Sequence, residues 1–321
     1  MSLKQLVVIG LLISCLVACG DTPNREWQLT ARGSYTATLA EDGSYAVVGS
    51  ILHGGSLWRL KDGERLYNWN HAAGETSEII ASAISPDNLF ALTAEKRRMV
   101  LWQISSGRPV GFWEARGGVL DAAVSDGGRY VLVGQENYNA LYIESASGSI
   151  LGRMVHSGDV NTVAISGNGR VGVTGSEDGY VRIWDLRKEK ELHRFKLGDD
   201  VSVVAISHDG RLAFGSLYYG KGKIWDVSSG QELAEIGFPR ITQSAARFSR
   251  DNRWLLTGDT VRRVMLWDAK TGESIRTWAS RPPSFQPPSG LVVSDIAFGK
   301  QPETSAYAAF SNGKVVYWQD Q

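Results

Sequence analysis

The chain of 321 residues is poor in cysteine: it has two, Cys15 and Cys19, and both lie close to its start. The absence of any later cysteine excludes the disulfide framework on which many small secreted domains depend. An excess of charge of one sign is also missing, because lysine plus arginine and aspartate plus glutamate each number 34. A balanced chain has no overall field that attracts nucleic acid, so no nucleic-acid partner is expected.

Motifs that carry chemistry are equally scarce. The histidines are scattered, with no pair at metal-ligand spacing; they are His53, His71, His156, His193 and His208. The chain contains no haem-attachment motif, no phosphate-binding loop and no nucleophile elbow. The sequence therefore predicts no metal, no cofactor and no enzymatic activity.

Residues 1–18 have the composition of a cleaved leader. A single charge, Lys4, precedes an apolar run that is too short to span a bilayer comfortably and has the length of a signal-peptide core. The run ends in Leu16-Val17-Ala18-Cys19, which resembles the bacterial lipobox. The resemblance implies cleavage before Cys19 and lipidation of that residue. The alternatives are an ordinary cleaved signal and a plain membrane anchor.

The lipobox resemblance also implies a location. Each buried methylene of an acyl chain contributes about 0.8 kcal/mol, so several chains on Cys19 would make a stable membrane anchor. Gly20, and not aspartate, follows that cysteine. In proteobacteria-like sorting this favours the outer membrane, with the protein facing the periplasm. Residues 19–25 would then be the lipidated cysteine and a short tether.

Beyond residue 25 the chain is repetitive. It has eleven tryptophans and thirty-six glycines, and one aromatic returns at intervals of 44, 40, 42, 41, 42 and 51 residues. These aromatics are Trp58, Trp102, Tyr142, Trp184, Trp225, Trp267 and Trp318. The interval is that of one four-stranded propeller blade. Each is expected to pack in the core of its blade; if the Tyr142 hydroxyl lies at the rim, Tyr142→Phe should matter little.

Each period also has the same order of turns and strands. Asp-Gly and Asn-Gly turns such as AEDGSY and SGNGRV are followed by β-branched strands such as YAVVGS and VGVTGS. Three repeats end in Trp-Asp, at residues 184–185, 225–226 and 267–268. This pattern resembles the WD-repeat family and covers residues 26–321.

The fourth repeat is the most faithful to that family. The resemblance implies a hydrogen-bonded set of His156, Thr174 or Ser176, Asp178 and Trp184, because a buried indole and a buried imidazole both need partners. The other six repeats have no histidine at the matching place. They are therefore expected to rely on apolar packing alone.

The ends of the repeat array predict how the ring closes. The last repeat stops just after Trp318, with no residues left for a fourth strand, while residues 26–30 form a spare strand at the start. We therefore expect an all-β, seven-bladed propeller in which the N-terminal strand completes the last blade. That strand begins at the bottom rim, and a tether from Gly20 to Arg25 reaches about 20 Å. The bottom rim is thus expected near the bilayer, with the top face toward the periplasm.

The top-face loops hold the candidate binding residues. Tyrosine and arginine are enriched at interface hot spots, and these loops carry Arg97, Arg98, Tyr138, Tyr218, Tyr219, Arg262, Arg263 and Phe285. The expected function is docking of another envelope protein or peptide; the alternative for the loops is that they are merely solvated.

A second functional hypothesis places a site in the central channel, where a small ligand would bind or a hydrolase- or lactonase-like reaction would occur. Asp121 and Asp295 occupy equivalent inner-strand positions and are the candidates. In WD repeats an acid at this position is usually a structural hydrogen-bond acceptor, so the structural interpretation is favoured. The sequence names no partner and no oligomeric state.

Overall fold

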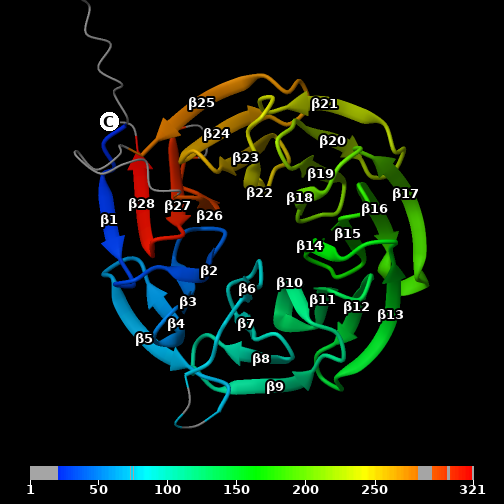
Figure 1. Ribbon diagram of the computed structural model, residues 1–321. Helices are drawn as coiled ribbons and strands as arrows, with labels where there is room; N and C mark the ends of the chain where they lie inside the picture. The colour runs from blue at the N-terminus through cyan, green and yellow to red at the C-terminus, as the bar shows by residue number, and fades with distance from the viewer. Residues whose placement is uncertain (1–20, 73, 75, 281–290, 302–303, 320–321) are drawn as a thin grey trace, which may run out of the picture.

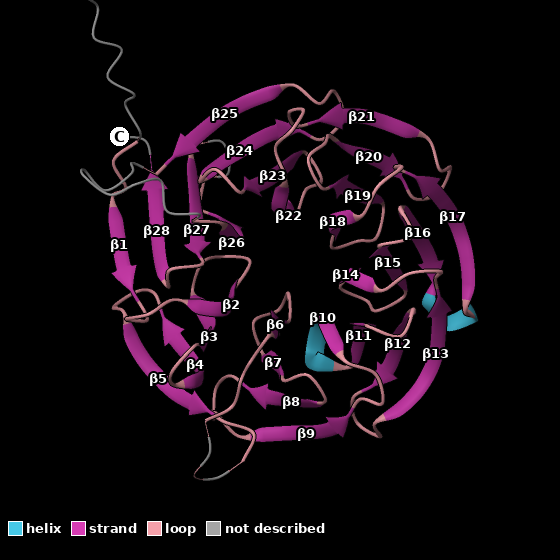
Figure 2. Ribbon diagram, viewed as in Figure 1, coloured by secondary structure: helices cyan, strands magenta, loops and turns pink. Residues whose placement is uncertain are grey.

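The computed structural model describes residues 21–72, 74, 76–280, 291–301 and 304–319. Seven four-stranded antiparallel sheets are arranged in a ring around a central channel (Figure 1). Over the described ranges, the only helical segments are two three-residue 3-10 turns, η1 (Asp126–Gly128) and η2 (Leu186–Lys188) (Figure 2). No helix in these ranges is long and apolar enough to cross a membrane.

We number the blades 1 to 7 in the order of their inner strands. The strands of blade 1 are β2 (Ser34–Leu39), β3 (Tyr45–Ser50), β4 (Gly54–Arg59) and β5 (Glu64–Trp69). Those of blade 2 are β6 (Ala81–Ile84), β7 (Phe90–Ala94), β8 (Arg98–Gln103) and β9 (Pro109–Glu114). Those of blade 3 are β10 (Val119–Val124), β11 (Tyr130–Gln135), β12 (Asn139–Glu144) and β13 (Ser149–Val155).

The next three blades repeat this order. The strands of blade 4 are β14 (Val160–Ile165), β15 (Val171–Ser176), β16 (Tyr180–Asp185) and β17 (Lys190–Lys196). Those of blade 5 are β18 (Val201–Ile206), β19 (Leu212–Leu217), β20 (Gly222–Asp226) and β21 (Glu232–Ile236). Those of blade 6 are β22 (Gln243–Phe248), β23 (Trp254–Asp259), β24 (Arg263–Asp268) and β25 (Ser274–Ala279).

Blade 7 joins the two ends of the chain. Its strands are β26 (Val293–Phe298), β27 (Ser305–Phe310), β28 (Lys314–Gln319) and β1 (Arg25–Gln28). β1 is the outer strand and pairs antiparallel with β28 (Figure 1). The predicted seven blades and the closure by an N-terminal strand are confirmed. The strand ends at Gln28 instead of residue 30, and the Thr30 hydroxyl donates to the Gly33 carbonyl in the following turn, 3.0 Å away.

The blades pack face to face through apolar side chains. Trp184 of blade 4, for example, lies in one buried cluster with Leu132, Tyr142 and Met154 of blade 3. Glycine near the end of the second strand allows this approach: a Cβ on Gly134 would lie 2.4 Å from the Val160 carbonyl oxygen of the next blade. The recurring glycine of strands such as YVLVGQ therefore sets the spacing between blades.

Candidate interaction surface

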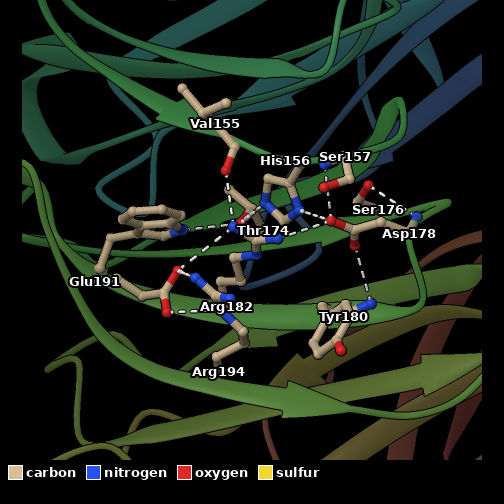
Figure 3. Close-up of polar contacts among 11 residues, drawn as sticks. Val155, His156, Ser157, Thr174, Ser176, Asp178, Tyr180, Arg182, Glu191 and Arg194 are labelled. Carbon is tan, nitrogen blue, oxygen red and sulfur yellow. Dashed lines mark hydrogen bonds and ion pairs between the residues drawn. The ribbon is translucent and has the colours of Figure 1, made fainter.

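Blade 4 contains the complete polar set expected from its sequence (Figure 3). Thr174 Oγ1 accepts the Trp184 indole N–H at 2.9 Å and lies 2.7 Å from His156 Nε2. The other imidazole nitrogen, Nδ1, lies 3.2 Å from Asp178 Oδ2. Burial lowers the pKa of His156 to about 4. The ring is therefore neutral at pH 7, and all bonds are satisfied when Nδ1–H donates to Asp178 and the Thr174 hydroxyl donates to Nε2.

An arginine joins this set to the neighbouring strands (Figure 3). Arg182 donates to Asp178 at 2.8 Å and to the Val155 carbonyl of β13 at 2.8 Å. Its side chain is only 9% exposed. Because the guanidinium bridges β16 to the last residue of the preceding blade, the set fixes blade 4 against blade 3 as well as satisfying the buried indole.

Blade 2 holds a second such set, which the sequence did not predict. His71 Nε2 lies 2.9 Å from Thr93 Oγ1, and the same hydroxyl accepts the Trp102 indole N–H at 2.8 Å. Glu95 is the nearby carboxylate: it accepts a hydrogen bond from Arg98 at 2.7 Å but lies 3.7 Å from His71 Nδ1, too far for the hydrogen bond that Asp178 makes with His156. The expectation that the other six blades rely on apolar packing alone is therefore wrong. His71 was missed because the loop before β6 is long and places it 22 residues before its threonine, against 18 for His156.

In other blades a single hydrogen bond satisfies the polar atom of the core aromatic. Trp267 donates to Thr257 Oγ1 at 2.8 Å, and Trp58 donates to Ser56 Oγ at 2.9 Å. The Tyr142 hydroxyl does not lie at the rim: it is buried and donates to the Gly169 carbonyl at 2.9 Å. Burial raises the pKa of Tyr142 to about 12. A polar partner for the core aromatic is thus the common solution, with the donor and acceptor types varying between blades.

The two channel carboxylates act as acceptors between blades. Asp121 accepts the N–H of Val163 in blade 4 at 2.9 Å, and Asp295 accepts the N–H of Leu39 in blade 1 at 2.8 Å. Asp295 also pairs with Arg247 at 2.8 Å. Burial raises the pKa of Asp121 to about 6. Both residues therefore hold neighbouring inner strands together, as the structural interpretation expected.

The channel itself is a polar cavity of about 390 Å³, lined mainly by small side chains such as Thr36, Ser82, Thr162, Ser202 and Ser244. Among the described residues no group of three or more His, Cys, Asp and Glu side chains is placed to hold a metal ion.

The top face is formed by the loops that follow the second and fourth strands of each blade. The described candidates all lie at turns between second and third strands: Arg97, Arg98, Tyr138, Tyr218, Tyr219, Arg262 and Arg263. Phe285 lies outside the described residues. Two of the arginines are held within their own blade, since Arg98 pairs with Glu95 and Arg263 with Asp259, each at 2.7 Å. They support the turns more than they extend from them.

Three of these turns place a bulky residue where the backbone favours glycine. Tyr138, Tyr219 and Arg262 have φ angles of 65°, 58° and 70°, whereas blade 4 has Gly179 at the same place with φ 78°. Tyr138 is 53% exposed and Tyr219 is 72% exposed. A left-handed conformation is unfavourable for such side chains, on the order of 1 kcal/mol each. Residues kept in strained, exposed positions point to a role at the surface.

The sector over blades 2 and 3 is also hollowed. A cavity of about 490 Å³ beside Arg97 is lined by Thr76 and Glu78, and one of about 620 Å³ is lined by Arg97, Glu114 and Arg116. Backbone bonds hold its loops together: Ala115 N–H donates to the Arg97 carbonyl, and Glu136 N–H donates to the Gly118 carbonyl. Arg116 was not among the expected residues; its exposure next to the Gly117-Gly118 turn could have suggested it.

A closed ring of seven four-stranded sheets defines a β-propeller, and two of its blades hold hydrogen-bonded His–Thr–Trp sets. Comparison with protein families agrees, because residues 148–185 match the family described as WD domain, G-beta repeat. The matched stretch covers β13 to β16, which includes the complete polar set of blade 4. No curated protein matches the chain.

Proposed function

We propose that this protein is a lipid-anchored protein of the bacterial envelope whose top face docks another envelope protein or peptide. The lipobox at Leu16–Cys19 supports the anchor, and Gly20 supports an outer-membrane, periplasm-facing location. The WD-repeat resemblance suggests a scaffold role, and the chain contains no catalytic motif that would favour an enzyme.

The observation that carries the docking role is the strained, exposed placement of Tyr138 on the face that also carries the hollows at Arg97 and Arg116. Exposed tyrosine and arginine are enriched at binding hot spots, and neither Arg97 nor Arg116 forms an ion pair with another described residue. The loops around Tyr138 are joined by backbone hydrogen bonds, so a partner would meet a preformed surface and little ordering entropy would be lost.

The test is affinity capture of the lipidated protein from membranes. Tyr138→Ala combined with Arg97→Ala should lose the captured partner, because truncating such residues typically costs about 2 kcal/mol or more, roughly thirtyfold in affinity. Lys188→Ala with Lys190→Ala, on a bottom loop, is the matched control and should retain it. Loss in the control with retention in the top-face variant would contradict the docking role.

The alternative function is a small-ligand or enzymatic site in the channel, and the raised pKa of Asp121 is the observation that favours it. Asp121→Asn distinguishes the two functions. If this variant removed the activity while both loop variants were silent, the channel site would replace the docking surface.

A further inference from the structure

The chain before β1 lies at the outer edge between blades 6 and 7. The Asp21 carbonyl accepts the Trp318 indole N–H at 3.4 Å, and the Asp21 carboxylate accepts the Ala279 N–H at 3.3 Å. Ala279 is the last residue of β25 and pairs with Arg263, which directly follows a top-face turn. Asp21 therefore lies at the top end of blade 6.

This placement corrects the expected orientation. β1 does begin on the bottom side, where Arg25 pairs with Tyr317 late in β28, but the residues before it turn back toward the top. The reason is local: blade 7 has Ala308 at the place of Thr174, so the Trp318 indole takes its acceptor from the Asp21 backbone. The expectation that the bottom rim lies near the bilayer assumed a tether that leaves from the bottom rim, whereas residues 21–24 lead to the top end of blade 6.

The top face next to this exit carries a basic–aromatic patch, which we define as Tyr218, Tyr219, Phe238, Arg240, Val261 and Arg262. Its apolar members are all large exposed side chains. The patch is rigid: Arg240 N–H donates to the Tyr219 carbonyl at 2.9 Å, and Tyr219 N–H donates to Thr242 Oγ1 at 3.1 Å. Thr260 N–H in turn donates to the Thr242 carbonyl at 3.1 Å, which joins the blade 5 and blade 6 loops.

Arg240 and Arg262 give the patch two positive charges. Two nearby acids are already paired, Asp259 with Arg263 at 2.7 Å and Glu235 with Lys221 at 2.8 Å, whereas Asp200, whose carbonyl accepts the Tyr218 N–H at 3.0 Å, forms no ion pair with a described residue. Within the part of the chain that the structure describes, no carboxylate pairs with Arg240 or Arg262. Aromatic rings beside arginines that form no ion pair match the chemistry of a bilayer interface with anionic headgroups.

We propose that the basic–aromatic patch rests on the surface of the membrane that anchors the protein. This inference rests on the lipid anchor of the proposed function. Only Gly20 separates Cys19 from Asp21, so the lipidated cysteine lies at most about 7 Å from Asp21. The edge formed by blades 6 and 7 is thereby held at the headgroups, where the patch reaches anionic lipid. Blades 2 and 3, across the ring (Figure 1), point away and leave Tyr138 free for a partner.

The experiment uses the lipidated protein reconstituted in vesicles of phosphatidylethanolamine and phosphatidylglycerol. Cys19 carries the lipid, so Tyr219→Cys supplies a single thiol for a fluorophore. Tyr138→Cys is the matched control, because it occupies the same left-handed turn position in blade 3. We expect a headgroup-attached quencher to quench the label at 219 several-fold more than the label at 138, and dissolved iodide to show the reverse order.

A second variant tests the charge. Arg240→Glu with Arg262→Glu should leave the protein on the vesicles through Cys19 but reduce lipid quenching at 219 to the level seen at 138. Equal quenching at both positions in the unaltered protein, or preferential lipid quenching at 138, would overturn the patch alone. If the protein did not float with the vesicles at all, the lipid anchor would be refuted, and this proposal with it. A label at 219 shielded from both quenchers would show that protein, such as a second copy of the chain, covers the patch.

Discussion

Arg250 Nε lies 2.9 Å from Glu41 Oε2, although 209 residues separate the two. The same guanidinium donates to the Pro86 carbonyl at 2.6 Å. Arg250 follows the inner strand of blade 6, whereas Glu41 belongs to blade 1 and Pro86 to blade 2. One side chain therefore crosses the bottom mouth of the channel and ties together blades on both sides of blade 7, where the ring is closed without a covalent link.

Arg250→Ala should loosen that closure. The pair is partly exposed, so we expect a loss of about 1 kcal/mol or less in the free energy of unfolding. The effect should be local, with faster amide exchange in β1 and β28, because those strands depend on the neighbouring blades staying in place. Arg211→Ala, whose side chain is 80% exposed, is the control. Unchanged amide exchange in β1 and β28 would show that the Arg250 contacts do not support the closure of the ring.

The threonine of each polar set should contribute more to the free energy of unfolding than its size suggests. Thr174→Val and Thr93→Val keep the volume but remove the hydroxyl that serves both an indole and an imidazole. Each should cost about 1–3 kcal/mol, because buried polar groups are left unpaired. Chemical denaturation measures the loss, with the exposed Ser147→Ala as reference. A Thr93→Val variant as stable as the reference would mean that the blade 2 set contributes nothing.

Tyr142→Phe should destabilise the protein by about 1 kcal/mol. The hydroxyl donates to the Gly169 carbonyl in a buried position, and the change leaves that carbonyl without its donor. Tyr35→Phe, at an exposed ring, is the matched control and should be neutral. Equal melting temperatures for the two variants would place the Tyr142 hydroxyl in water.

Stability should depend on pH in two opposing ways. Burial lowers the pKa of His71 and of His156 to about 4, against about 6.5 in the unfolded chain. Between these pH values the unfolded chain binds more protons than the folded protein. The stability that the two neutral histidines contribute is therefore complete above about pH 6.5 and is lost as the pH falls toward 4. Asp121 acts in the opposite sense. Its raised folded-state pKa of about 6 adds stability as the pH falls from about 6 toward 4.

Melting temperatures between pH 4 and 7 separate these contributions. Replacing both histidines with glutamine should flatten the fall in stability below about pH 6.5. Asp121→Asn should make the fall between pH 6 and 4 steeper, because the compensating proton uptake is gone. A double histidine variant with the slope of the unaltered protein would contradict the low histidine pKa values.

Cys19→Ser should release the protein from membranes or leave an unprocessed precursor, because the sulfur that accepts the lipid is gone. Membrane fractionation and the mass of the mature protein give the answer. Cys15→Ser is the control, since that residue precedes the cleavage site and should be neutral. A Cys19→Ser protein that is processed and sediments with membranes as before would refute the lipid anchor.

Much of the fold was predictable because the propeller is built from local signals. The aromatic recurring from Trp58 to Trp318 fixed seven blades, and the missing strand after Trp318 predicted that residues near Trp27 complete the ring. The set around His156 was predictable because its members lie at regular spacings within one repeat. Its counterpart at His71 was not, because the loop between Trp69 and β6 varies in length, and spacing across a loop carries no information about where its residues fold back.

The sequence by itself determined the strand order, the seven-bladed ring and the face on which Tyr138 and Tyr219 lie, since hydrophobic period and turn chemistry act between near neighbours. Only the tertiary structure decided the contacts between residues far apart in the chain. Arg250 pairs with Glu41 across the channel, and Asp21 accepts a hydrogen bond from Ala279 at the edge of blade 6. Such pairs depend on where closed blades bring their loops, and the Asp21 backbone gives the Trp318 indole the acceptor that its own blade lacks.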